Sequence, residues 1–280
     1  EKSANINIEH NQKARLSLSL SLSLSLSLSR NVHPEAVWLS QEVLPMSIQD
    51  VYDGAQLMCR TLRMLDCAQL TVQVSEDMAE YAEIIRNERP EQPLGAPFDL
   101  FQSLRNNKAF WITARDLKGT LVHTQALRLL DLGEQTLADH LRRNFRDYPP
   151  AGLPIDFENS AYNPGPGARR ITGRALYHGE FWIKEDSSFR GRGIVDILSR
   201  FAFLSATMHW QPDYLWGLMA RHNARRGLAE GVGYMHSDPF AVSWKVADRN
   251  QPIVGNLVWL AMDMPTAHPS SIPAIPSSSA

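Results

Sequence analysis

The chain has 280 residues, which suits one large domain or two small ones. Hydrophobic residues make up 44% and charged residues 21%, and the formal net charge is only -2, so the composition is globular and excludes the broad basic surface of a nucleic-acid-binding protein. No uninterrupted apolar run is long enough to cross a bilayer, and Cys59 and Cys67 form no CxxC pair, so we expect no membrane partner and no disulfide framework and favour a cytoplasmic location.

The two ends of the chain differ in composition from the middle. Leucine and serine alternate strictly over residues 16–29, which suits either a strand with a leucine face or a low-complexity tract. We interpret residues 1–45 as a low-complexity extension outside the fold and expect the native start at or near Met46. Residues 265–280 are rich in Pro and Ser and are predicted to form a disordered tail. A single domain is therefore expected over residues 46–264.

The first half of this domain mixes helical and strand patterns. Apolar residues recur at helical spacing after Ser47, and a period-two alternation follows. Ser75 and the acidic residues after it suit the start of the next helix. Two β-rich runs around a short turn that contains glycine then predict a hairpin. The expected elements are a helix over 47–65, a strand over 68–75, helices over 75–89 and 98–107, hairpin strands over 109–116 and 119–132, and a helix over 133–148.

The second half opens with a loop rich in Pro and Gly. The expected elements are this loop over 149–167, strands over 168–185 and 213–219, helices over 194–208 and 221–237, and strands over 240–247 and 253–263. The second of these helices is weakened by Gly227. This mixture of elements predicts an α/β or α+β fold with one mixed sheet.

The segment Arg190-Gly191-Arg192-Gly193 stands between a predicted strand and the helix that begins at Ile194. Free N–H groups and the dipole at a helix N-terminus favour an anion such as phosphate, glycine lets the backbone approach it, and arginine adds charge-assisted hydrogen bonds. The segment therefore suits a cofactor that carries phosphate. The alternative is a plain turn with solvated arginines, since the pattern is neither a Walker loop nor GxGxxG.

This region resembles the GNAT superfamily of acetyl-CoA-dependent N-acetyltransferases. In that family a strand precedes an R/Q-x-x-G-x-G/A loop whose amides hold the coenzyme A pyrophosphate, and a helix, a strand and a further helix follow. The order of elements over residues 68–264 fits this pattern and implies a GNAT-like mixed central sheet flanked by helices. Asn223, together with Gly233-Tyr234, fits the later helix of the family. The resemblance assigns coenzyme A binding to Asn223 and to the loop residues Arg190, Gly191, Arg192, Gly193, Ile194 and Val195.

The resemblance implies an N-acyltransferase in which an amine attacks the thioester of acetyl-CoA, the cosubstrate, or of another acyl-CoA. A small-molecule or peptide amine is the expected acceptor, and a homodimer is one option for the assembly. Two positions depart from the family pattern. Val195 stands where the loop has Gly or Ala, and Ala229 stands where many members carry a tyrosine that acts as general acid toward the thiolate. Both departures favour the alternative, a catalytically inactive GNAT-like module that binds acyl-CoA or another protein.

Direct attack requires a base that accepts the proton of the amine. By period two, Leu176, His178, Glu180 and Trp182 are expected to share one face of their strand. Glu180 and His178 are therefore the candidates for the base, and polar residues at the edge of a sheet are the alternative interpretation. The stretch 132–168 is expected to shape the acceptor pocket.

One further motif suggests another class of chemistry. His236-Ser237-Asp238 matches the His-x-Asp pair of non-haem iron oxygenases, with His268 as a nominal third ligand. Because His268 lies in the predicted tail, coincidence is the better explanation, and we predict no metal site.

Overall fold

The computed structural model describes residues 46–99, 108–185, 189 and 193–262. The chain divides into two units, 1–45 and 46–280, and all described residues belong to the second. The predicted extension, the predicted tail, most of the helix expected over 98–107 and three residues of the glycine loop lie outside the described residues.

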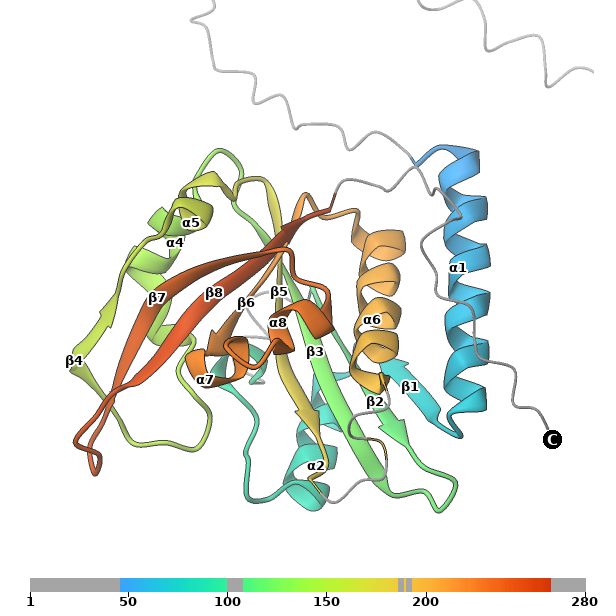
Figure 1. Cartoon of the computed structure of the whole chain (residues 1–280), viewed down its shortest axis with the longest axis horizontal. Helices are drawn as coiled ribbons and strands as arrows, with labels where there is room; N and C mark the ends of the chain where they lie inside the picture. The colour runs from blue at the N-terminus through green and yellow to red at the C-terminus, as the bar shows by residue number, and fades with distance from the viewer. Residues whose placement is uncertain (1–45, 100–107, 186–188, 190–192, 263–280) are drawn as a thin grey trace, which may run out of the picture. The chain divides into compact units, whose positions relative to one another are not determined.

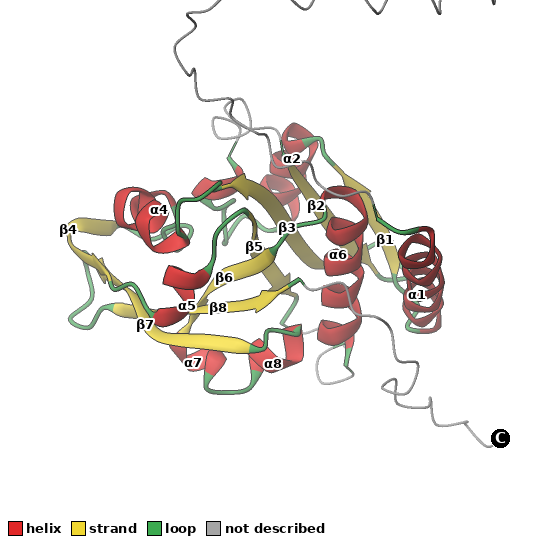
Figure 2. Ribbon diagram, turned by 90° about the horizontal axis from the view of Figure 1, so that it is seen from above, coloured by secondary structure: helices red, strands yellow, loops and turns green. Residues whose placement is uncertain are grey.

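One mixed sheet organises the described chain (Figures 1 and 2). Its strands are β1 Thr71–Ser75, β2 Ala109–Arg115, β3 Leu121–Asp131, β4 Ile155–Tyr162, β5 Arg174–Ile183, β6 Tyr214–Ala220, β7 His236–Val246 and β8 Ile253–Ala261. They lie in the order β1-β2-β3-β5-β6-β8-β7-β4, and all neighbours are antiparallel except β5 and β6, which are parallel. The predicted class, a mixed central sheet flanked by helices, is confirmed.

Helices cover both faces of this sheet (Figure 2). The helices are α1 Ile48–Cys67, α2 Met78–Glu88, α4 Leu137–Asn144, α5 Pro166–Arg170, α6 Ile194–Trp210, α7 Arg221–Ala224 and α8 Leu228–Val232, with short 3-10 turns η1 Ala96–Phe98 and η2 Phe145–Asp147. Side chains of α1, α6 and α8 join one hydrophobic cluster, and those of α2, η1, α4 and α5 join the other. None of the helices in the described part of the chain combines the length and apolar character needed to cross a bilayer.

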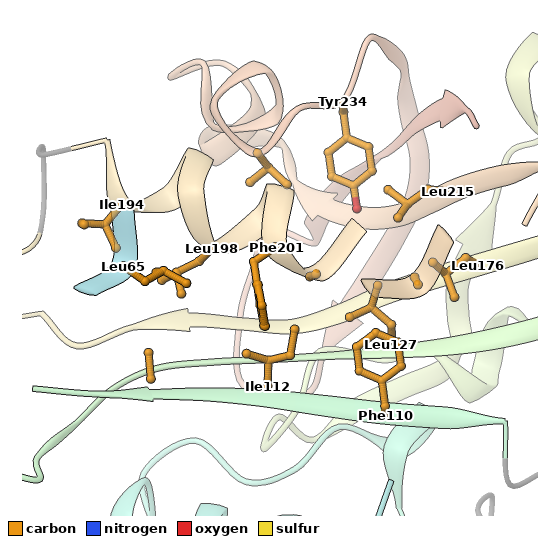
Figure 3. Close-up of a cluster of buried hydrophobic side chains, with 14 of the residues drawn as sticks. Leu65, Phe110, Ile112, Leu127, Leu176, Ile194, Leu198, Phe201, Leu215 and Tyr234 are labelled. Atoms are coloured by element: carbon orange, nitrogen blue, oxygen red, sulfur yellow. The ribbon is translucent and has the colours of Figure 1, made fainter. Parts of the chain in front are cut away.

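The first cluster fixes α6 against the sheet (Figure 3). Leu198 and Phe201 of α6 are buried with Ile112 of β2 and Leu176 of β5. Complete burial of one such side chain contributes about 1.5–3 kcal/mol to folding. This packing sets the position of α6 beside the end of β5, where the predicted site lies.

Two helix starts show how local chemistry sets boundaries. Ser47 and Asp50 form a capping box at α1, as a capping residue ahead of a helical pattern suggests. Ser75 does not cap α2, which is a correction. Asp77 is the cap, and its carboxylate accepts hydrogen bonds from the amides of Ala79 and Glu80 at 2.9 and 3.1 Å.

Two predicted segments differ from the structure. The loop expected over 149–167 contains the edge strand β4 and the helix α5, because β4 pairs with β7 only near its two ends and carries little period-two signal. The helix expected over 221–237 is two short helices. Gly227 has a φ of 79° between them, in the left-handed region that ends a helix readily.

Two buried imidazoles predict how the fold responds to pH. Burial lowers the pKa of both His123 and His178 to about 3. In the unfolded chain these imidazoles bind protons below about pH 6.5, whereas in the folded chain they stay neutral down to about pH 3. The free energy of unfolding therefore falls as pH drops from about 6.5 toward 3. We expect His123→Leu to reduce the loss of stability between about pH 7 and pH 5 by about 2 kcal/mol. Urea denaturation at both pH values measures this.

The matched control is His222→Leu. His222 is exposed, and its replacement should leave the pH dependence of stability as it is in the wild type. Equal pH dependence in the His123→Leu variant and the wild type would contradict a neutral buried imidazole at position 123.

Candidate functional site

The parallel strands β5 and β6 separate after a short paired stretch. Ala175 to Tyr177 pair with Tyr214 to Trp216, and no pairing between the two strands follows in the described residues. A cleft of about 450 Å³ opens where they diverge. Its lining includes residues from β5, β6, α7 and α8 and from the segments before η1 and after η2. The cleft therefore lies at the break in the sheet, where the edges of two strands are free to face a ligand.

A β-bulge in β5 decides which side chains face the cleft. The register between β3 and β5 shifts between Thr124 and Ala126, and Glu180 has a φ of 55°, which is rare for a residue with a side chain. His178 contacts the α6 side of the sheet, whereas Glu180 contacts Gly95 on the other side. The prediction that these two candidates share one face is therefore wrong, because period two breaks at the bulge.

His178 belongs to a row of hydrogen bonds in which each donor and acceptor can be assigned. The carbonyl of Leu198 accepts from the Gln125 side chain at 2.8 Å, so the amide oxygen of Gln125 faces His178. That oxygen accepts from His178 Nε2 at 3.0 Å, which leaves Nδ1 to accept from the hydroxyl of Tyr234 at 3.0 Å. Both ring nitrogens are engaged, and burial lowers the pKa of the imidazole to about 3. This row holds Tyr234 in place.

The Tyr234 hydroxyl lies where β5 and β6 part. A Cβ atom on Gly217 would stand 2.8 Å from this hydroxyl and 2.9 Å from the carbonyl oxygen of His178. Position 217 therefore requires glycine because backbone and hydroxyl approach it closely. Burial raises the pKa of Tyr234 well above its usual value, so the group stays a protonated phenol. Sequence analysis placed this tyrosine only as the end of the later helix.

Glu180 is held by a buried ion pair that sequence analysis missed. One carboxylate oxygen accepts from the Gly95 amide at 2.8 Å, and the other contacts the guanidinium of Arg89. The side chains of Arg89 and Glu180 are 3% and 8% exposed. Arg89 also donates to Thr124 Oγ1 at 2.8 Å and to the Gln92 carbonyl at 3.0 Å. No motif marks Arg89, which ends an ordinary helical pattern before Pro90.

The start of α6 is the part of the predicted cofactor site that the structure describes. Gly193 has a φ of 73°, and a Cβ atom added there would meet nothing within 4 Å. Ile194 is buried and Val195 packs against the first hydrophobic cluster. Among the described residues, no side chain caps this helix. Asn223 lines the cleft, whereas Arg190, Gly191 and Arg192 lie outside the described residues.

Four buried aromatic side chains belong to the lining of the cleft. They are Phe98, Tyr148, Tyr177 and Trp244, and Pro149 and its neighbours complete this part of the lining. Phe98 stacks on Tyr177 at 5.6 Å between ring centroids, and Tyr148 meets Tyr177 edge-on at 5.0 Å. The expected contribution of the stretch 132–168 to a pocket is thus carried by Tyr148 and the residues after it.

The His-x-Asp motif has a structural role. Asp238 accepts hydrogen bonds from the amides of Gly167 and Ala168 at 2.7 and 3.2 Å, and His236 stacks on Trp259 at 4.1 Å. Within residues 46–99, 108–185, 189 and 193–262, no group of three His, Cys, Asp or Glu could hold a metal ion. The motif anchors α5 to β7 and β8.

Because the ion pair is buried, we expect a conservative substitution of Glu180 to lower the free energy of unfolding by a large amount. Glu180→Gln keeps the shape of the side chain but leaves Arg89 buried without its counter-charge, so we expect a loss of about 3 kcal/mol or more in the free energy of unfolding. Glu88→Gln is the matched control, because Glu88 pairs with Arg115 at the surface and should lose less than about 1 kcal/mol. Urea denaturation compares the two, and equal losses would contradict the buried pair.

Comparison with known proteins finds similarity only among solved structures; no protein-family model and no curated protein matches. Spermidine N-acetyltransferase from Vibrio cholerae, as a dodecamer in an intermediate state, aligns at 12% identity over 69% of this chain and 94% of that chain, with a TM-score of 0.40. The Vibrio cholerae enzyme in complex with CoA and spermine aligns at 13% identity over 69% and 96%, with a TM-score of 0.35.

An N-acetyltransferase from Staphylococcus aureus Mu50 aligns at 12% identity over 70% of this chain and 97% of that chain, with a TM-score of 0.37. In this chain β5 is followed by the glycine segment, α6, β6 and the broken helix α7–α8, which is the order that the resemblance implies. The element order therefore agrees with the one expected from the sequence, a mixed central sheet flanked by helices.

Proposed function

We propose that the chain is an acyl-CoA-dependent N-acyltransferase that uses acetyl-CoA as cosubstrate. The observation that carries the proposal is the cleft at the diverging pair β5 and β6, beside a strand with a bulge and followed in the chain by a helix start that no described side chain caps. Free strand edges in the cleft can bind the extended amide-containing arm of coenzyme A by backbone hydrogen bonds. In this arrangement the thioester would lie between the two strands.

The phosphate end of the cosubstrate would lie at the start of α6. The N–H groups and the dipole of a helix N-terminus favour a diphosphate there, and no described atom lies within 4 Å of a Cβ placed on Gly193. Val195 packs against the core, so its methyl groups have a place away from the ligand. In the proposal Arg190 and Arg192 add charge-assisted hydrogen bonds, and Asn223 contacts the cosubstrate from α7.

In the proposed reaction the amine nitrogen attacks the thioester carbon, the carbon–sulfur bond breaks and the thiolate leaves. Glu180 lines the cleft and is our candidate for the group that accepts the amine proton. His178 is assigned a positioning role, because both of its ring nitrogens are engaged. The Tyr234 hydroxyl lines the cleft and is our candidate proton donor to the thiolate, in place of the tyrosine absent at Ala229. In this role its O–H would turn from His178 Nδ1 toward the sulfur.

A catalytically inactive acyl-CoA-binding module is the second candidate. It is favoured by Ala229, which is buried in the first hydrophobic cluster and offers no hydroxyl. The two functions differ in one measurement. If the purified protein with acetyl-CoA releases free thiol when a pool of amines is added, it is an enzyme; binding without release supports the module.

Binding of acetyl-CoA should raise the melting temperature of the chain. A ligand at about a hundredfold excess over its Kd stabilises the native state by about 2.7 kcal/mol, which corresponds to several degrees in Tm. We expect Gly193→Asp to abolish most of this rise, because a carboxylate at the start of α6 repels the diphosphate.

Gly193→Asn is the matched control for this prediction. Asn has the shape of Asp and tolerates the same left-handed backbone, so the two variants differ mainly in charge. The Asn variant should keep most of the rise in Tm that acetyl-CoA causes. Equal shifts in both variants would remove the start of α6 from the binding site.

A further inference from the structure

Helix α1 packs on the rest of the described chain with one side only. Both views place it beside α6, at the edge of the described chain (Figures 1 and 2). Thr61 and Leu65 are its buried residues, and a Cβ atom added at Gly54 would lie 3.8 Å from the side chain of Met208 on α6. These contacts account for the packed side of α1 and leave its other sides to be explained.

Another side of α1 carries a stripe of exposed apolar residues. The stripe consists of Ile48, Tyr52, Ala55, Cys59 and Leu62. Ile48, Tyr52 and Leu62 are 85%, 58% and 38% exposed. Spacings that alternate between four and three residues place the five side chains in one line, about a third of a turn away from the packed side. Single exposed apolar side chains are ordinary, but a contiguous stripe marks a contact surface.

The spacing of the stripe fits another helix with the same period. In a pair of helices, residues that alternate at three and four positions insert between the corresponding residues of the partner. Of the other described helices, α2 and α4 to α8, none has exposed apolar residues at this spacing. The matching helix that the described chain supplies is therefore α1 of a second copy.

The charges of α1 favour an antiparallel pair. Its first half carries Asp50 and Asp53, and its second half carries Arg60, Arg63 and one acid, Asp66. A two-fold axis near the middle of the stripe places the acidic half of one helix beside the basic half of its partner, and it sets the two helix dipoles in opposite directions. A parallel pair would place like charges side by side.

We propose that two copies of the chain associate through the stripe on α1, with the two helices antiparallel about a two-fold axis. Each copy contributes five side chains, so the contact belongs to the small class of interfaces that bury less than about 1,200 Å² in total. Such a contact gives a dimer that forms at micromolar concentration. None of the described residues that line the cleft belongs to α1, so the inference stands apart from the proposed function.

Sedimentation equilibrium of the full chain over about 1 to 200 µM measures this association. We expect a monomer–dimer equilibrium that depends on concentration. Ile48→Gln combined with Tyr52→Gln removes apolar area from both copies and should raise the Kd of the dimer at least about tenfold. The matched control is Leu117→Gln, because Leu117 is 73% exposed between β2 and β3, and the Kd should stay as in the wild type.

A second pair of variants tests the antiparallel orientation. Arg60→Glu combined with Arg63→Glu makes both halves of α1 acidic, so an antiparallel pair loses attraction and gains repulsion. We expect the Kd to rise at least about tenfold at low salt. A parallel pair would exchange one like-charge contact for another and keep its Kd. Arg169→Glu combined with Arg170→Glu, at exposed positions of α5, changes the net charge equally and should raise the Kd much less.

The inference is overturned by any of three results. The first is a wild-type chain that sediments as a monomer over the whole range, which is also the result expected if another segment of the chain occupies the stripe. The second is a dimer whose Kd is equal in the wild type and in the variant at Ile48 and Tyr52, because the contact then lies elsewhere. The third is an equal rise in Kd for the two arginine variants. Far-UV circular dichroism equal to that of the wild type shows that each variant is folded, and no measurement requires acetyl-CoA.

Discussion

The ion pair between Glu180 and Arg89 holds the bulge on which the cleft depends. Glu180 has a strained left-handed backbone, which costs of order 1–3 kcal/mol and persists only where the surroundings enforce it. Here the surroundings are Arg89, fixed in turn by Thr124 and the Gln92 carbonyl, and the Gly95 amide. The bulge turns Glu180 toward the Gly95 amide and Arg89 while leaving His178 on the side of α6. Helix α2, the turn before η1 and strand β5 are thus joined at one carboxylate.

On the α6 side of the sheet, a row of hydrogen bonds joins Leu198, Gln125, His178 and Tyr234 beside the point where β5 and β6 separate. Each link has one allowed direction, because a backbone carbonyl only accepts and the Gln125 amide must present its nitrogen to it. The row delivers the Tyr234 hydroxyl to the point that Gly217 leaves free. A well-satisfied buried network of this kind specifies one arrangement of α6, β3, β5 and the segment after α8.

Local sequence patterns predicted most helices and strands, but they did not predict the contacts between side chains at the site. The helix after Ser47, the hairpin of β2 and β3 and the helix that begins at Ile194 follow from signals within a few residues. The pairing of Arg89 with Glu180 joins residues 91 positions apart, and no short-range rule connects them. The bulge itself broke the period-two argument, so a pattern that was correct up to His178 placed Glu180 on the wrong face. Strand β4 was missed because its middle residues pair with no neighbour.

In the proposed function, the cosubstrate and the acceptor depend on different kinds of group. The start of α6 offers backbone amides and the freedom of Gly193, which depend on conformation rather than on side-chain identity. Of the aromatic residues in the cleft lining, Phe98 and Tyr148 lie outside the strands, whereas Tyr177 and Trp244 lie on β5 and β7. Tyr177 is also one of the residues that pair β5 with β6, so only replacements outside the strands leave that pairing unchanged. In the proposed function, acceptor specificity can therefore diverge at such positions while the start of α6 and the sheet stay the same.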